Sequence, residues 1–199
     1  MKVNYILLII FSVLNLSTKS QLLDSIENSF TYKPKLLLKL DARNSFISDN
    51  SVKYGGLKIG LNYNRTTKIG IGASWITSNY ISKHNEEDVK LENINFLTFI
   101  EYTFYKSKHW YANIPVQLGF GELKYTNNKE VKANTFIFTY EPAMTVEYRF
   151  LKIFGLGFGF GYRFAVYSKQ DITEKLSAPI YILRFKLHLG DIISKNKKK

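Results

Sequence analysis

The stretch IFGLGFGFGYRFAV, residues 153–166, decides the fold because its residues alternate between two kinds at every step. From Phe154 to Val166 the even-numbered residues are large and apolar, whereas the odd-numbered ones are four glycines followed by Arg163 and Ala165. Successive side chains of a β-strand point to opposite faces, whereas an amphipathic helix would repeat roughly every 3.6 residues. The stretch therefore predicts a strand with one apolar face and one small or polar face.

The same period of two recurs along most of the chain. Besides this stretch, it is found in seven segments: 35–43, 56–63, 69–77, 94–105, 110–121, 136–150 and 180–189. Strands of globular proteins are typically about five or six residues long, whereas a tilted strand needs about nine to eleven residues to cross a bilayer. Most of the predicted strands reach the longer range, and this favours strands that cross a membrane.

The connections between the predicted strands alternate in length. Long polar connections fall at 46–52, 83–90, 127–131 and 168–178, and short ones fall at 64–67, 106–108 and 151–152. Up-and-down membrane barrels have long outer loops and tight periplasmic turns. We therefore expect an all-β fold, an eight-stranded antiparallel up-and-down transmembrane β-barrel over residues 34–190, with both ends on the periplasmic side.

A soluble barrel would show the same alternation with its apolar face inside, as in a lipocalin-like ligand binder. Two features favour the membrane alternative in addition to strand length. The apolar faces are uninterrupted and rich in aromatic residues, as in a lipid-facing band. The opposite face of 153–166 carries four alternating glycines, which would weaken a strand facing water. Inside a narrow barrel those glycines would make room for long side chains.

If the apolar faces meet lipid, the other faces form the barrel interior. We expect it to be filled by a polar network of ion pairs, because eight strands enclose space only for side chains. A narrow solute or ion channel is the alternative. The residues assigned to the interior are Lys39, Asp41, Arg43, Lys58, Glu101, Glu141, Glu147, Arg149, Arg163, Arg184 and Lys186.

One pair inside this network can be predicted from register. The tight turn at 151–152 implies that opposed residues of the last large hairpin sum to about 303. Glu141 and Arg163 come within one of that sum and share the polar face, so we expect them to form an ion pair. Pro115 and Pro142 cannot donate a ladder hydrogen bond, and a bulge at either would change the face assignment beyond it.

The two ends of the chain differ from the barrel. Residues 1–20 combine Lys2, an apolar run from Ile6 to Leu14, and small residues at Thr18 and Ser20, a pattern typical of a cleaved signal peptide. We expect residues 21–33 to form a periplasmic N-terminal segment and residues 191–199 a basic periplasmic tail. The expected location is the cell outer membrane of a Gram-negative bacterium, after cleavage of this N-terminal signal peptide.

Composition removes several kinds of chemistry. The 199 residues include no Cys and three His, so cysteine-based sites are excluded and a His-rich metal site is not expected. We expect no cofactor, no metal site and no enzyme activity. A lipid-modifying enzyme with a Ser–His pair assembled from distant strands is the open alternative. A cation site at His84, Glu86, Glu87 and Asp88 is a further possibility, but a solvated charged loop is the preferred interpretation.

The net charge of +12 bears on partners. Basic residues gather at the short turns, where they would meet the anionic headgroups of outer-membrane lipids. The residues expected to make that contact are Arg65, Lys68, Lys106, Lys108 and Lys152. We expect extracellular partners to bind through the loops 46–52, 83–90, 127–131 and 168–178, no nucleic-acid ligand, and a monomer.

Four stretches carry a family resemblance: the signal ending at Ser20–Gln21, the opening YKPKLLLKLDARNSFIS (32–48), the hairpin YGGLKIGLNYNRTTKIGIGASW (54–75) and the closing PIYILRFKLHLGDI (179–192). They resemble small outer-membrane β-barrel proteins of Bacteroidetes-type bacteria, a largely uncharacterised family. The resemblance implies fold and location only, and it suits a structural or surface-interaction role. One departure is the tail after the last strand, because many such barrels end on an aromatic residue.

Overall fold

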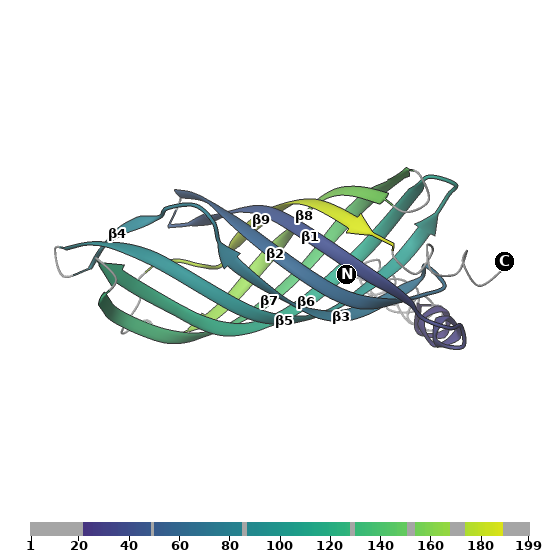
Figure 1. Cartoon of the computed structure of the whole chain (residues 1–199), viewed down its shortest axis with the longest axis horizontal. Helices are drawn as coiled ribbons and strands as arrows, with labels where there is room; N and C mark the ends of the chain where they lie inside the picture. Colours follow the sequence, from purple (N-terminus) through teal and green to yellow (C-terminus); the bar gives the residue numbers. More distant parts are fainter. Residues whose placement is uncertain are drawn as a thin grey trace, which may run out of the picture.

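The computed structural model describes residues 22–48, 50–84, 87–127, 130–150, 154–167 and 174–188. Within them the chain forms a short helix over 22–30 and one antiparallel sheet that closes on itself (Figure 1). The predicted signal peptide, the tail 191–199 and the turn 151–152 lie outside the described residues. The strands are β1 (Lys35–Ile47), β2 (Asn50–Tyr63), β3 (Thr67–Ile76), β4 (Ile81–His84), β5 (Glu87–Lys106), β6 (Trp110–Asn127), β7 (Glu130–Phe150), β8 (Phe154–Tyr167) and β9 (Ala178–Leu187).

The sheet closes into a ring of eight strand positions, as predicted. Its hydrogen-bonded order is β3-β2-β1-β9-β8-β7-β6-β5-β4, and β3 also pairs with β5. The short strand β4 continues along β5 beyond the end of β3, from Ile81 opposite Lys90 to His84 opposite Glu87. It therefore shares a ring position with β3. Figure 1 shows β4 and the helix at opposite ends of the barrel. We call the end with β4 the outer end and the end with the helix the inner end.

The apolar faces point outward in the body of the barrel, which makes the soluble alternative wrong. On β8, the side chains of Phe158 and Phe160 are 57% and 64% exposed, whereas Arg163 is 3% exposed. The predicted glycine face thus lines the interior. A soluble barrel would have buried the phenylalanines and exposed the arginine.

Neither proline shifts the register. On β6 and β7, Asn113 is opposite Thr145 and Val116 is opposite Pro142, so the same pairing continues past both prolines. The inward and outward faces are therefore retained from Ala133 to the end of β7. The irregularities lie elsewhere, between Thr103 and Tyr105 on β5 and between Tyr125 and Thr126 on β6.

The connections at the outer end are shorter than predicted. β1 runs to Ile47 and β2 begins at Asn50, so most of 46–52 is strand. Likewise most of 83–90 belongs to β4 and β5, and β5 and β7 contain 20 and 21 residues. The strands therefore extend well beyond the roughly nine to eleven residues that cross a bilayer.

The segment before the barrel holds a helix that sequence analysis did not predict. Helix 22–30 contacts the inner end of β2 through Phe30, whose ring centroid lies 4.9 Å from that of Tyr63. Its backbone continues through residues 31–34 directly into β1. Among the described residues, no helix has the length and apolar character needed to cross a membrane.

Candidate functional site in the barrel interior

All the side chains assigned to the interior are buried. Each is at most 5% exposed, although charged residues are almost never buried without partners. They come from β1, β2, β5, β7, β8 and β9 and meet in the inner and middle parts of the barrel. We call this set the polar network: Lys39, Asp41, Arg43, Lys58, Glu101, Glu141, Glu147, Arg149, Arg163, Arg184 and Lys186, to which the structure adds Lys68, Asn113, Gln117 and His188.

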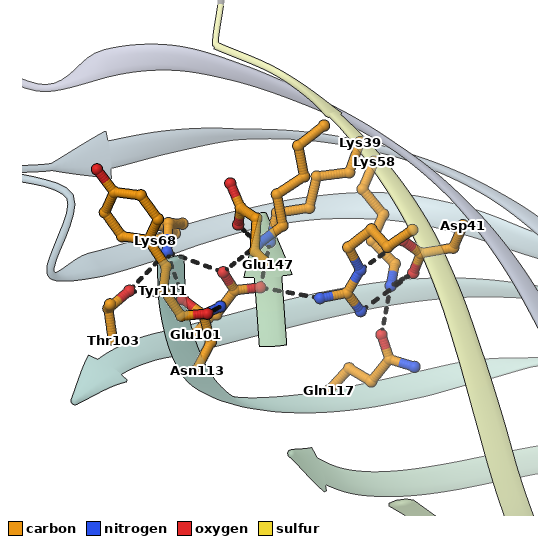
Figure 2. A network of polar contacts seen from close by, with 12 residues as sticks. Lys39, Asp41, Lys58, Lys68, Glu101, Thr103, Tyr111, Asn113, Gln117 and Glu147 are labelled. Atoms are coloured by element: carbon orange, nitrogen blue, oxygen red, sulfur yellow. Dashed lines mark hydrogen bonds and ion pairs between the residues drawn. The ribbon is translucent and has the colours of Figure 1, made fainter. Parts of the chain in front are cut away.

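Glu101 on β5 is the centre of the polar network. Its two carboxylate oxygens accept hydrogen bonds from four cationic groups on three other strands (Figure 2). The donors and their distances are Lys39 Nζ at 2.9 Å, Lys68 Nζ at 2.9 Å, Arg184 Nη1 at 2.9 Å and Lys186 Nζ at 2.6 Å. One buried carboxylate thus links β1, β3 and β9 to β5 across the barrel.

Asp41 on β1 forms a second centre nearer the outer end. Arg184 Nε donates to Asp41 Oδ1 at 2.7 Å, and Lys58 Nζ donates to Asp41 Oδ2. Lys58 also donates to Gln117 Oε1 at 2.6 Å (Figure 2). Since Arg184 bonds to both Asp41 and Glu101, the two centres are joined.

The expected pair between Glu141 and Arg163 is present. Arg163 Nε donates to Glu141 Oε1 at 2.5 Å, and the strands pair with sums of 304, as between Tyr140 and Phe164. Glu141 Oε2 also accepts from Arg43 and from Gln117. The carboxylate therefore has two cationic partners, where sequence analysis expected one.

Glu147 completes the inner side of the polar network. Its Oε2 accepts from Lys186 Nζ at 2.6 Å, and its Oε1 lies 3.0 Å from His188 Nε2. The glycine at position 155 makes this possible, because a Cβ there would lie 2.5 Å from Glu147 Oε1. Gly155 thus makes room for a charged side chain as the alternation predicted, whereas Gly159 and Gly161 lie close against the backbone of β7.

The expected position of Lys68 is wrong. This residue was assigned to the headgroup-contacting set, but it is 2% exposed and bonds to Glu101, Thr103 and Asn113. The β2–β3 turn is tight, so β3 is already paired at Thr67, opposite Tyr63. Lys68 consequently shares the inward face of β3. The remaining described members of that set, Arg65, Lys106 and Lys108, are exposed at the inner end, and Lys152 lies outside the described residues.

The outer part of the interior is apolar, which sequence analysis did not predict. A cluster of buried residues, which we call the outer cap, fills it: Ile47, Val52, Tyr54, Tyr80, Val89, Leu91, Leu123, Tyr125, Ile137 and Leu176. These residues come from the outer ends of the strands and from the segments before β4 and β9. The sequence feature that could have revealed the outer cap is the period of two, which continues to the outer ends of β5, β6 and β7 with apolar residues on the inward face.

The segment before β9 is fixed inside the outer cap. The Tyr125 hydroxyl donates to the Glu174 carboxylate, and the Tyr167 hydroxyl donates to the Glu174 carbonyl. Lys175 N donates to Ser48 Oγ at 3.0 Å. Burial and the charge of Glu174 raise the pKa of Tyr80. Leu176, 2% exposed, is held within the apolar cluster.

Residues considered for other chemistry are dispersed. His109 Nδ1 lies 3.1 Å from the carbonyl of Arg149, and His188 contacts Glu147. In the 83–90 hairpin, Asp88 is exposed and Glu86 lies outside the described residues. The described part of the chain contains no group of three or more His, Asp or Glu residues able to hold a metal ion.

No protein-family model matches the chain, and no curated protein matches it. Solved structures do. Neisserial surface protein A is 9% identical, with a TM-score of 0.61 over 77% of this chain and 96% of that one. Also similar is the N-terminal β-barrel domain of Pseudomonas aeruginosa OprF, with 9% identity and a TM-score of 0.49 over 78% of this chain and 98% of that one. Yersinia pestis Ail in complex with sucrose octasulfate is 10% identical, with a TM-score of 0.48 over 78% of this chain and 98% of that one. The first likeness shows the fold, an eight-stranded outer-membrane β-barrel.

Proposed function

We propose that this chain is an outer-membrane protein of a Gram-negative, Bacteroidetes-type bacterium, exported by its N-terminal signal peptide. Its role is structural or surface-interacting: a closed barrel that carries its strand ends and loops at the cell surface. The fold supports membrane insertion, because large apolar side chains such as Phe96 and Phe160 remain exposed on its outside. Fractionation tests this step, since recovery without detergent would contradict it.

The observation that carries the proposal is the filling of the interior at two levels. Charged side chains at most a few per cent exposed fill the inner and middle parts, and apolar side chains fill the outer part. An open pore needs a continuous path of water, whereas eight strands leave room only for side chains. The filled interior favours a plugged barrel over the channel alternative.

Conductance measurements separate these two functions. The mature protein, refolded into a planar bilayer, should give no steady single-channel current, because both levels block the path. A control variant that weakens only the outer cap, Leu176→Ala, should also give no steady current, because the polar network remains. Steady current from the unaltered protein would overturn the proposal in favour of a channel.

The second part of the proposal concerns sidedness. Epitope tags at Glu87 or Asp171 should label intact cells, because the outer end is expected to face the medium. Tags at Thr66 or Lys106 should label only permeabilised cells. The reverse pattern would invert the orientation and leave the fold unchanged.

We further propose that the protein has no catalytic activity, binds no nucleic acid and is a monomer. The contacts given for His109 and His188 support the first point, because their partners are a carbonyl and a carboxylate and neither is the hydroxyl of a nucleophilic serine. Mass spectra of outer-membrane lipids from cells with and without the protein should be identical. A lipid species that depends on the protein would establish the enzyme alternative.

A further inference from the structure

A polar pocket of about 450 Å³ lies at the inner end, between helix 22–30 and the barrel. Its walls come from three parts of the chain: Ser25 and Asn28 on the helix, Asn64 and Thr66 in the β2–β3 turn, and Lys106 at the end of β5. Tyr32 and Phe104 also line it and are 54% and 48% exposed. Exposed aromatic rings of this kind mark the boundary between membrane and water.

The pocket favours a negatively charged group. Lys106 Nζ donates to the Asn64 carbonyl at 3.2 Å and to Thr66 Oγ1 at 2.5 Å, which leaves one of its three hydrogens for another partner. The charge of Arg65 lies close enough to Lys106 to repel it. The residues that line the pocket offer amides and hydroxyls, and none of them is a carboxylate. Two neighbouring cations with such surroundings suit a phosphate.

The backbone of Arg65 adds an independent observation. Asn64 and Arg65 have φ of 48° and 58°, and Thr66 N donates to the Tyr63 carbonyl at 2.9 Å, which closes a two-residue turn. Such turns strongly prefer glycine at the second central position, where arginine is strained. Local strain of this kind is characteristic of functional positions. The strained position brings the charge of Arg65 near Lys106, with Arg65 Nη1 donating to the Tyr111 hydroxyl at 3.4 Å.

An apolar groove lies on the lipid-facing side of the barrel, next to the pocket and farther from the inner end. It is lined by Leu61 on β2, Ile69 and Ile71 on β3, and Thr98 on β5. The groove and the pocket adjoin along the paired strands β3 and β5. Ile69, in the groove, is opposite Ile100, and two residues closer to the inner end Thr67 is opposite Tyr102, which lines the pocket. At about 3.3 Å per residue, the groove and the pocket lie within the length of one lipid.

We propose that the pocket and the groove together bind one anionic glycerophospholipid of the inner leaflet. Its phosphate contacts Lys106 and Arg65, and an acyl chain occupies the groove along β3 and β5. This inference rests on the proposed function, which places the inner end at that leaflet.

Native mass spectrometry of the mature protein in neutral detergent, titrated with phosphatidylglycerol or phosphatidylcholine, tests the site. The unaltered protein should retain one phosphatidylglycerol preferentially. Arg65→Gly and Lys106→Gln should each weaken that retention by about tenfold, as expected for losing one charge-assisted hydrogen bond. Arg65→Gly should stay folded because glycine relieves the strained turn.

Lys35→Gln is the matched control, because Lys35 is an exposed cation at the same end, three ring positions from β5. An equal loss in this control, or no loss in Arg65→Gly, would overturn the site. Competition by inorganic phosphate or glycerol phosphate would show a free-anion site and overturn the lipid assignment. Heat-dependent gel migration reports barrel insertion separately. A protein that fails to insert contradicts the proposed function, whereas an inserted protein without lipid preference contradicts only this inference.

Discussion

The polar network and the outer cap lie in the same barrel, on the same strands, and have opposite chemistry. On β5, Glu101 faces inward in the network, whereas Leu91 faces inward in the cap. The outward faces are reversed in the same way. At the depth of the network, Phe96 is exposed on the outside of β5, and at the depth of the cap, Lys90 forms an exposed ion pair with Glu92. The inward face therefore has the polarity opposite to that of the surroundings at each depth.

The change of chemistry marks where lipid ends. On β6, Leu118 and Phe120 face outward, and then Glu122 and Lys124 form an exposed pair at 2.8 Å. The partners of Glu122, Ile94 on β5 and Phe136 on β7, are still exposed and apolar. The polar level crosses the sheet one outward pair further on, because Lys124 is opposite Glu92 on β5 and opposite Asn134 on β7. The outer ends of these strands behave as a small water-soluble barrel, built on the membrane-spanning one. Four substitutions test this comparison.

The largest effect is expected at the centre of the network. Glu101→Gln keeps the shape of the side chain but leaves Lys39, Lys68 and Lys186 without their shared carboxylate. Uncompensated buried charge should lower the free energy of unfolding by about 3–5 kcal/mol. Urea unfolding from detergent micelles measures this change. If Glu101→Gln lowered the free energy of unfolding by less than Leu176→Ala in the outer cap, the network would not be the more tightly coupled region.

In the outer cap the cost should come from lost packing. Leu176→Ala removes a side chain that is 2% exposed and leaves a cavity among apolar neighbours. We expect a loss of about 2–4 kcal/mol, in the lower range for such truncations because residues 174–177 lie outside the strands. The same urea experiment applies, and Leu176→Met should cost less because it preserves volume. Equal losses for both variants would argue against a packed cap.

A smaller effect tests coupling inside the network. Glu141→Gln leaves both Arg163 and Arg43 without a carboxylate, whereas the double variant with Arg163→Met leaves only Arg43. The double variant should therefore be more stable than Glu141→Gln alone, by about 1–2 kcal/mol. A double-mutant cycle in urea measures the difference. Strictly additive losses would show that the pair contributes no coupling.

The smallest effect belongs to the outside of the cap. Glu122→Gln breaks an ion pair with Lys124 in which both side chains are well exposed. Exposed pairs contribute little in water, so the free energy of unfolding should be indistinguishable from that of the unaltered protein. The same measurement applies, and a loss comparable to that of Glu101→Gln would place this level inside the membrane.

The body of the barrel could be predicted because parity carries most of the information. A period of two assigns every second side chain to one face, and Lys39, Glu147 and Arg184 all face inward as expected. Among the residues assigned to a site, the face was wrong at Lys68, where the predicted strand began too late. The two prolines did not interrupt it, since the pairing at Val116 and Pro142 keeps the register.

The outer cap could not be predicted in the same way, because the sequence pattern does not state what surrounds a strand. Alternation looks the same when lipid and interior exchange polarity, as between Phe120 and Lys124 on β6. Residues such as Leu123 and Tyr125 continued the period with reversed chemistry and were therefore assigned to loops or left out. Helix 22–30 could have been predicted, because Leu22, Ile26 and Phe30 are spaced four residues apart, as on one face of a helix. It was missed because only segments with a period of two were followed.

The position of Glu101 also constrains how the chain can assemble. Its partners lie 62, 33, 83 and 85 residues away in sequence, and Asp41 lies 143 residues from Arg184. All four partners of this carboxylate are thus in place only when the first and last strands have met. A half-assembled barrel in lipid would hold isolated charges, so insertion and ring closure should proceed as one concerted event. Contacts this distant in sequence also predict slow folding, governed by the seam between β1 and β9.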